Sequence, residues 1–250
     1  MMDKEPGTTI DYQVIELDLV DSTNNYAMRQ LHAGMAKAGE LYLARQQSAG
    51  KGQRGKTWHH EPGQQIAMSL VLNAELFSLN DQFLLSAATG LGCLYTVSEE
   101  ISGGWRLKWP NDLYWNDRKA AGILIENVLR GSQWLYAVIG VGMNLNQESF
   151  PENLGNPVSL KQLLGRHFEI LPFAKRLARQ IGAQVQRLAT EPELILEEYN
   201  ALLYKRGETI RLKNEEHTLQ TRLEGVNRQG KLITTDGLFS HGEAEFLVTS

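Results

Sequence analysis

The residues best suited to chemistry lie in one polar loop, residues 46–58, which is broken by glycine. Three glycines within six positions would allow the backbone to curl, so that several N–H groups face one anion. Lys51, Arg54 and Lys56 add three positive charges to the same segment. These groups are suited to phosphate binding, but the loop taken alone slightly favours a solvated, mobile surface loop.

The spacing of this loop excludes one familiar phosphate-binding motif and weakens another. It does not follow the pattern Gly-x-x-x-x-Gly-Lys-Ser/Thr, so a P-loop is not supported. Gly50, Gly52 and Gly55 do fit Gly-x-Gly-x-x-Gly. That pattern should open a helix, however, and the next apolar segment has the alternation of a strand.

A second polar segment, residues 108–122, supplies a possible counterpart. It begins Lys-Trp-Pro-Asn-Asp and returns through Lys119 to Gly122. Proline removes a donor from a strand ladder, so Pro110 should mark an edge or a kink and turn Asn111 and Asp112 toward a cavity. Taken alone, the Asn-Asp pair is better explained by an ordinary turn. Lys119 on the returning strand would bring a cation to the same end of a sheet.

These two segments, with Asp-Ser-Thr-Asn-Asn at 21–25 and Gly-Val-Gly-Met-Asn-Leu-Asn at 140–146, resemble the biotin–protein ligases (biotin–[acetyl-CoA-carboxylase] ligases). Their order and spacing match along nearly the whole chain, and Lys-Trp-Pro-Asn-Asp followed by Arg-Lys-x-x-Gly-Ile-Leu is a specific pattern. The resemblance implies that ATP and biotin give biotinyl-5′-AMP and pyrophosphate, with Mg²⁺ screening the pyrophosphate. A lysine of a biotin carboxyl carrier domain, part of a biotin-dependent carboxylase, would then accept the biotin.

The resemblance also implies roles for individual residues. The catalytic cations would be Lys119, Arg54 and Lys51, with Lys119 bridging the biotin carboxylate and the α-phosphate. The biotin site would comprise Ser22, Thr23, Asn24, Gln46, Lys51, Gly52, Gln53, Lys119 and Gly122. The ATP site would comprise Lys51, Arg54, Lys56, Trp58, Asn111 and Asn144. Asp112 would hold or orient Mg²⁺. For residues 22–24 the alternative is helix capping, which explains one of the three.

The loop departs from the family pattern at positions where many members carry arginine, here Lys51, Gln53 and Lys56. Gln53 matters most, because a cation there would help to retain the adenylate. A glutamine predicts either a leakier intermediate or compensation by Arg54. The glycines and charges also predict that the loop is disordered without ligand and orders over the adenylate, which would exclude water.

Hydrophobic periodicity and turn residues place these motifs in an α+β fold. The expected fold is a mixed sheet of the class II aminoacyl-tRNA synthetase and biotin ligase type with flanking helices (catalytic domain, residues 1–204), followed by a small SH3-like β barrel (residues 205–250). Residues 1–9 are expected to be a flexible tail. Expected strands are 12–20, 40–46, 64–72, 106–109, 112–115, 119–129, 134–144, 209–212, 217–226, 231–234 and 243–248. Expected helices are 22–31, 81–101, 160–164, 171–188 and 193–204.

Composition narrows the function classes. A net charge of −4 and a pI of about 5.9 disfavour a broad nucleic-acid surface, and no DNA partner is expected. The resemblance implies a short form without the DNA-binding domain of repressor members. The single Cys93 lies in an apolar run and is expected to be buried. With no signal peptide or membrane span in the sequence, a cytoplasmic location is expected. The protein is expected to be a monomer or weak homodimer. A lipoate ligase or octanoyltransferase and a non-catalytic biotin sensor are the alternatives.

Overall fold

A seven-stranded mixed sheet forms the body of the computed structural model, which describes residues 12–75, 77–213 and 217–247. The strand order is β1-β2-β3-β7-β6-β5-β4; β1 and β2 are parallel, and the other neighbours are antiparallel. The strands are β1 (Gln13–Val20), β2 (Glu40–Gln47), β3 (Gln65–Asn73), β4 (Trp105–Lys108), β5 (Asp112–Trp115), β6 (Arg118–Arg130) and β7 (Gln133–Asn144). The expected mixed α+β fold is confirmed.

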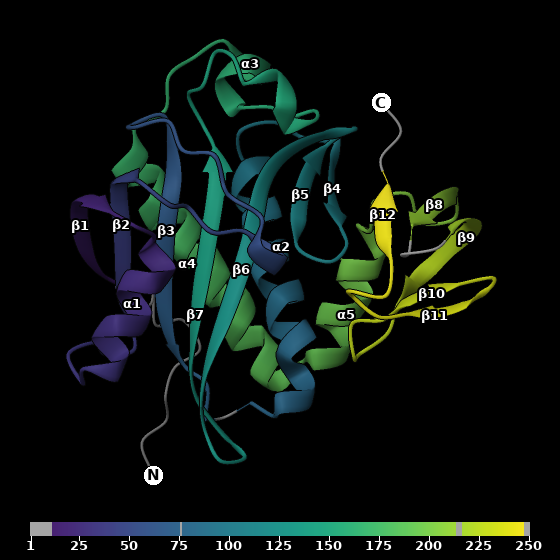
Figure 1. Cartoon of the computed structure of the whole chain (residues 1–250), viewed down its shortest axis with the longest axis horizontal. Helices are drawn as coiled ribbons and strands as arrows, with labels where there is room; N and C mark the ends of the chain where they lie inside the picture. The colour runs from purple at the N-terminus through teal and green to yellow at the C-terminus, as the bar shows by residue number, and fades with distance from the viewer. Residues whose placement is uncertain (1–11, 76, 214–216, 248–250) are drawn as a thin grey trace.

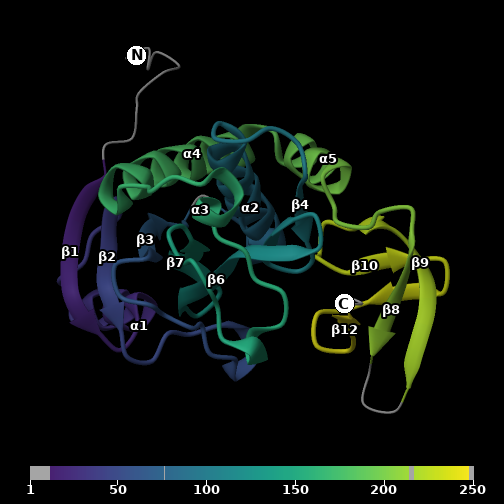
Figure 2. The ribbon, with the colours of Figure 1, turned by 90° about the horizontal axis from the view of Figure 1, so that it is seen from above.

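Helices cover both faces of this sheet (Figures 1 and 2). One face carries α2 (Gln82–Ser98), α4 (Ile170–Thr190) and α5 (Pro192–Ala201), while α1 (Thr23–His32) packs on the other. The short α3 (Leu160–Leu164) begins at Ser159, whose hydroxyl accepts from the Gln162 N–H in a capping box. Most of α2 is apolar around its circumference and is buried between the sheet and α4, as expected of a central packing helix.

The α1 face has a smaller core, which fixes the helix carrying residues 23–25. Ala27 is fully buried against the sheet, and the Tyr26 and Tyr42 rings meet edge to face at 5.2 Å. Aromatic pairs of this geometry add to the stabilisation from burial alone. The N-terminal end of α1 is therefore held rigidly above the middle of the sheet.

A second, five-stranded antiparallel sheet lies beside α5 and the β4–β5 edge (Figure 1). Its strands are β8 (Thr209–Lys213), β9 (Thr218–Val226), β10 (Leu232–Thr234), β11 (Gly237–Phe239) and β12 (Glu245–Leu247). Arg228 joins it to the body through Asp81, at 2.7 Å, and through Glu193. The Trp109 indole N–H also donates to the Gly230 carbonyl at 2.8 Å. This sheet is consistent with the expected SH3-like barrel.

Several expected boundaries were wrong for identifiable reasons. The last helix ends at Ala201 instead of 204, because Leu202 and Tyr204 form backbone hydrogen bonds with Leu107 of β4. The helix α2 ends at Ser98 instead of 101. The expected strand 134–144 is β7, which lies inside the sheet between β3 and β6 and begins one residue earlier. The strand β11 was not expected. The proposed tail 1–9 and position 248 lie outside the described residues.

No helix in the described ranges combines the length and apolarity needed to cross a membrane.

Candidate active site

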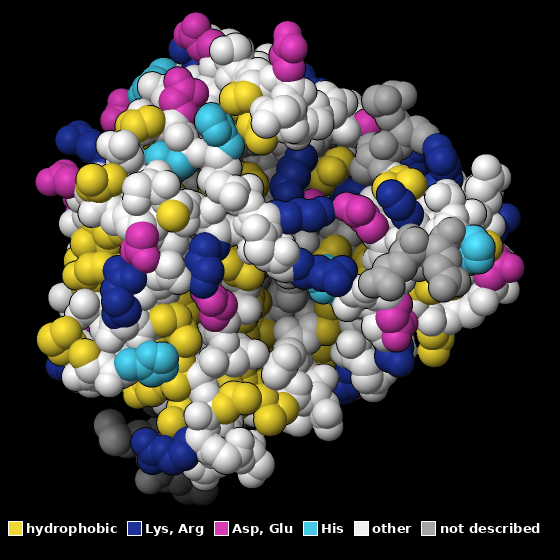
Figure 3. Space-filling view, viewed as in Figure 1, with side chains coloured by type: hydrophobic (Ala, Val, Ile, Leu, Met, Phe, Trp, Pro, Cys, Tyr) yellow, Lys and Arg dark blue, Asp and Glu magenta, His cyan; other side chains and the backbone are white. Residues whose placement is uncertain are grey.

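A cavity of about 450 Å³ opens between the larger sheet and the C-terminal sheet. Its wall combines the N-terminal end of α1, the loop after β2, the β4–β5 connection, the middle of β6 and β7, and residues 241–246. Lys and Arg side chains gather with acidic side chains around this hollow, as Figure 3 shows. Segments far apart in the sequence therefore meet at one charged site.

Glycines of β6 and β7 form part of the floor of this cavity. Gly122 and Gly142 are register partners on these two strands, and the Trp58 indole lies directly on them. A Cβ on Gly142 would come within 2.6 Å of Trp58 Nε1, and one on Gly122 within 3.1 Å of the ring. The Trp58 Nε1 atom is buried with no hydrogen-bond partner among the described residues. The absence of side chains on this floor is what admits a large flat ring.

The polar loop folds as a tight hairpin in this structure. The Trp58 N–H donates to the Gly50 carbonyl at 2.9 Å, and the Gly52 N–H donates to the Lys56 carbonyl at 2.7 Å. Arg54 and Gly55 have φ values of 55° and 75°, in the left-handed region that glycine favours. Paired backbone groups close the loop on itself in this conformation. The expectation that it orders over the adenylate stays a prediction.

The residue trio at 22–24 reaches the cavity, but its members are not equally free. Ser22 is buried, lines the cavity and makes no side-chain capping bond in the described structure. The Thr23 N–H and hydroxyl both donate to Gln47 Oε1, at 2.8 and 3.2 Å. The Asn24 amide donates to the Leu124 carbonyl and to Glu126, and Asn24 Oδ1 accepts from Ser69. Asn24 is thus engaged with the protein itself.

The structure does not bring Gln46 or Asn144 to the cavity wall, as the sequence analysis expected. The side chain of Gln46 is exposed outside the cavity, and its neighbour Gln47 lines the wall instead. Adjacent strand residues face opposite sides, and the sequence does not say which glutamine faces inward. Asn144 is buried, and its amide donates to the Val158 carbonyl at 3.2 Å while Oδ1 accepts from Gln147 at 3.1 Å. The remaining expected site residues line the cavity.

Each basic side chain that the sequence analysis assigned to the site has an interaction partner within the protein. The Lys119 ammonium lies 2.7 Å from Asp112, beside the Trp58 ring at 5.6 Å. Lys51 pairs with Glu126 at 3.0 Å, and Lys56 pairs with Glu245 at 2.9 Å. Arg54 Nη1 donates to the Gly242 carbonyl at 3.4 Å. The charges of the site are therefore largely compensated in the absence of substrate.

Sequence reasoning assigned no role to Lys108, which is another cation of the wall. It is nine-tenths buried, and its ammonium lies 4.9 Å from the Phe246 ring centroid and 5.6 Å from that of Tyr114. Burial lowers the pKa of Lys108 from its ordinary value. A basic residue at the start of the Lys-Trp-Pro-Asn-Asp motif was a signal for this role, but its burial depends on Phe246 from the distant C-terminal sheet.

Comparison with known proteins identifies the family. The sequence model of the biotin/lipoate A/B protein ligase family matches residues 16–144, more than half of the chain. The chain belongs to this family. It is 30% identical over 180 residues to the bifunctional ligase/repressor BirA of Escherichia coli, which covers 71% of this chain and 55% of that protein. It is 28% identical over 205 residues to the biotin–[acetyl-CoA-carboxylase] ligase of Mycobacterium tuberculosis, covering 79% and 74%.

Solved structures confirm the fold of this ligase-family chain. A biotin protein ligase from Aquifex aeolicus, in complex with biotin and ATP, superposes with a TM-score of 0.80 at 22% identity. The match covers 95% of this chain and 99% of that one. The chain spans about half the length of the first curated relatives it matches, 55% for Escherichia coli and 48% for Bacillus spizizenii.

The described residues of the ligase-family site offer Mg²⁺ few charged ligands. In the described part of the chain, no three His, Cys, Asp or Glu side chains form a ready-made metal cluster. Asp112 supplies one carboxylate at the cavity wall, next to Lys119. Mg²⁺ is commonly bound by one or two carboxylates together with substrate phosphates. The donor set therefore fits a metal that arrives with a nucleotide.

Proposed function

We propose that the chain catalyses the ATP-dependent activation of biotin to biotinyl-5′-AMP, and its transfer to a lysine of a biotin carboxyl carrier domain. The observation that carries this proposal is the place of Lys119 in the cavity. Its ammonium lies beside the Asp112 carboxylate and the Trp58 ring, in a cavity that Ser22, Gln47 and the cations of the hairpin also line. Such a lining offers polar groups for a neutral ring system and positive charge for phosphates.

In the first step a biotin carboxylate oxygen would attack the α-phosphorus, forming a P–O bond while the bond to pyrophosphate breaks. Two anions must approach each other, so the repulsion has to be offset by fixed positive charge. Lys119 would exchange Asp112 for the carboxylate and the α-phosphate. Lys108, Arg54 and Lys56 would face the phosphates, and Trp58 and Asn111 would contact the adenosine side. Asn144, whose amide is already engaged, has no direct role in this proposal.

The biotin side would be built from Ser22, Thr23, Gln47 and the backbone of residues 52–53. A ureido group needs both a donor and an acceptor on a rigid platform. The Ser22 hydroxyl offers both, and Gln47 is held rigidly by its two hydrogen bonds from Thr23. Gly122 and Gly142 leave room for Trp58, which lies directly on them and would form one wall for the ring system.

Asp112 would hold Mg²⁺ together with the phosphates, and the metal would offset the charge of the leaving pyrophosphate. In the second step an uncharged lysine amine of the carrier domain would attack the acyl carbonyl, AMP would leave, and the amine would lose a proton. The hairpin would keep water from the anhydride during this interval. We further propose that residues 205–250 are a separate SH3-like module, that the protein acts in the cytoplasm, and that it is a monomer or weak homodimer that binds no DNA.

The test is mass spectrometry of the purified protein incubated with ATP, Mg²⁺ and either biotin or lipoate. Biotinyl-AMP from the wild type, its loss in Lys119→Met, and its retention in Lys161→Met would support the proposal. Lys161 is a matched control, because it pairs with Glu148 away from the cavity. Lipoyl-AMP alone would reassign the substrate within the family. Biotin binding with neither adenylate would indicate a sensor and overturn the enzymatic proposal.

A further inference from the structure

Glu126, on β6, joins two parts of the site that are separate in the sequence. Its Oε2 accepts from the Asn24 amide at 2.9 Å, and its Oε1 accepts from the Lys51 ammonium at 3.0 Å. The side chains of Glu126 and Lys51 are 28% and 40% exposed, less than those of the Lys56–Glu245 pair at 74% and 57%. The Lys51 pair is therefore the better shielded of the two ion pairs that hold the hairpin.

Asn24, which holds the Glu126 carboxylate, is itself fixed by its neighbours. Asn24 uses its second amide hydrogen on the Leu124 carbonyl, and its Oδ1 accepts from Ser69. Gly140 lies so close that a Cβ there would be 3.0 Å from Asn24 Nδ2, so the Asn24 amide has little room to move. The carboxylate is thus held in place by buried groups before it meets Lys51.

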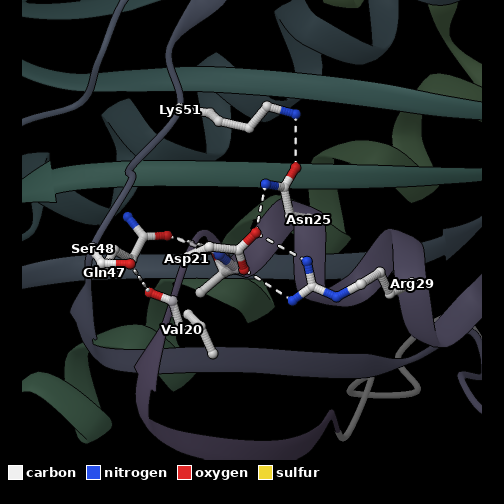
Figure 4. A network of polar contacts seen from close by, with 8 residues as sticks. Val20, Asp21, Asn25, Arg29, Gln47, Ser48 and Lys51 are labelled. Atoms are coloured by element: carbon white, nitrogen blue, oxygen red, sulfur yellow. Dashed lines mark hydrogen bonds and ion pairs between the residues drawn. The ribbon is translucent and has the colours of Figure 1, made fainter.

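Asn25 presents a second oriented acceptor to the same ammonium. Asn25 Oδ1 accepts from Lys51 at 2.8 Å, while its Nδ2 donates to Asp21 at 2.8 Å. Arg29 grips Asp21 with two bonds of 2.9 Å, as Figure 4 shows. Because Asp21 can only accept, it forces the Asn25 oxygen toward Lys51. We name this arrangement of Glu126, Asn25 and Asp21 around the ammonium the Lys51 clamp.

The clamp controls where the hairpin lies over the cavity. Lys51 pairs with Thr57 across the hairpin, and Trp58 follows directly and bonds back to Gly50. Holding the Lys51 ammonium therefore holds the strand that lays Trp58 on Gly142. The contacts of Arg54 and Lys56 with the C-terminal sheet are exposed, and exposed contacts of this kind contribute little to stability.

We propose that Glu126 is a positioning residue that keeps the hairpin closed over the adenylate through Lys51. The proposal rests on the ligase function above. It assigns Lys51 to loop closure instead of phosphate contact. It also explains how the hairpin retains biotinyl-AMP although it carries Gln53 where many family members have arginine. Glu126 itself touches no reacting atom. Its loss should change how long biotinyl-AMP stays bound and leave its formation nearly unchanged.

The decisive variant is Glu126→Gln, which keeps an oxygen for Asn24 but loses the charge that holds Lys51. The ratio of released biotinyl-AMP to transferred biotin should rise roughly tenfold, the effect expected for one lost charge-assisted hydrogen bond. The rate of adenylate formation at saturating biotin and ATP should stay within about twofold. Lys51→Met should leak to the same extent, and the double variant should leak no more than either single variant. Glu148→Gln, which breaks an ion pair outside the cavity, is the control.

A second readout needs no activity. Trypsin should cut after Arg54 roughly tenfold faster in Glu126→Gln than in the wild type, because the hairpin opens more often. Leakage and cleavage equal to those of Glu148→Gln would overturn the proposal, as would lost adenylate formation without leakage. If Glu126→Gln does not fold, trypsin cleavage of Lys51→Met after Arg54 carries the test, because it needs no activity. If the wild type forms no biotinyl-AMP, the proposed function fails, while trypsin still decides whether the clamp closes the hairpin.

Discussion

The Lys119 ammonium and the Asp112 carboxylate lie 2.7 Å apart where β5 and β6 pair. The Asp112 side chain is only 13% exposed, so this is a sheltered pair at the wall of the cavity. An anionic substrate that binds Lys119 must compete with this carboxylate. Once displaced, the carboxylate becomes available to a cation that arrives with the substrate.

Asp112→Asn should therefore change the Mg²⁺ requirement more than the fold. We expect the Mg²⁺ concentration for half-maximal adenylate formation to rise roughly tenfold, because a neutral amide is a weaker ligand for a hard cation. A Mg²⁺ titration at fixed ATP, with thermal unfolding as the control for folding, measures this. An unchanged Mg²⁺ dependence with lower activity would mean that Asp112 serves only as the counter-ion of Lys119.

Gly142→Ala tests the contact between the glycine floor and the Trp58 indole. The added methyl would lie 2.6 Å from Trp58 Nε1, closer than non-bonded atoms tolerate. Overpacking of this kind costs about 1–3 kcal/mol. Urea unfolding should show this loss, and adding Trp58→Ala should recover most of it by emptying the space. A double variant no more stable than Gly142→Ala would contradict the packing described here.

The contact of Trp109 with the C-terminal sheet should matter more than the ion pair between Lys56 and Glu245. Trp109→Phe removes a buried N–H from the Gly230 carbonyl, which costs about 1–3 kcal/mol. Glu245→Gln breaks an exposed pair, worth about 1 kcal/mol or less. Chemical denaturation of both variants compares them directly. Equal stabilities would place the attachment of the sheet elsewhere, for example at Arg228.

Cys93 should be chemically silent in the folded protein. It is fully buried in α2, and burial raises the pKa of its thiol to about 12 from an ordinary 9.0. Since the folded pKa is the higher one, this thiol contributes stability below pH 9 that is lost as the pH rises toward 12. A disulfide reagent at pH 8 should react only as fast as the protein unfolds. Rapid labelling without denaturant would show that the helix core opens locally.

The order of elements and most site residues could be predicted from the sequence, because strand alternation, helix periodicity and one specific motif mark them locally. Two features depended on distant contacts. The choice of Gln47 over Gln46 depends on Thr23, and the end of α5 depends on backbone bonds to β4. The strand β11 has only three residues, too few to show an alternating pattern. Local sequence patterns do not show which residues come into contact from distant parts of the chain.

The charged partners of the site were also beyond prediction. Lys51, Lys56 and Lys119 were expected to bind substrate phosphates or carboxylate, yet each one forms an ion pair with a carboxylate of the protein. Glu126 and Glu245 belong to segments read as ordinary strands, where a glutamate is usually a solvated surface residue. Only the three-dimensional structure shows that Glu126 of β6 and Glu245 of β12 lie against lysines of the hairpin.

The wall of the cavity draws on residues from Ser22 to Phe246, almost the full span of the described chain. A fragment ending before residue 240 would keep every strand of the larger sheet but would lack His241, Glu245 and Phe246. During synthesis on the ribosome, the sheet could therefore form while the reaction chamber was still open on one side. The cavity would be enclosed only after residues 241–246 had been made and had packed beside the larger sheet.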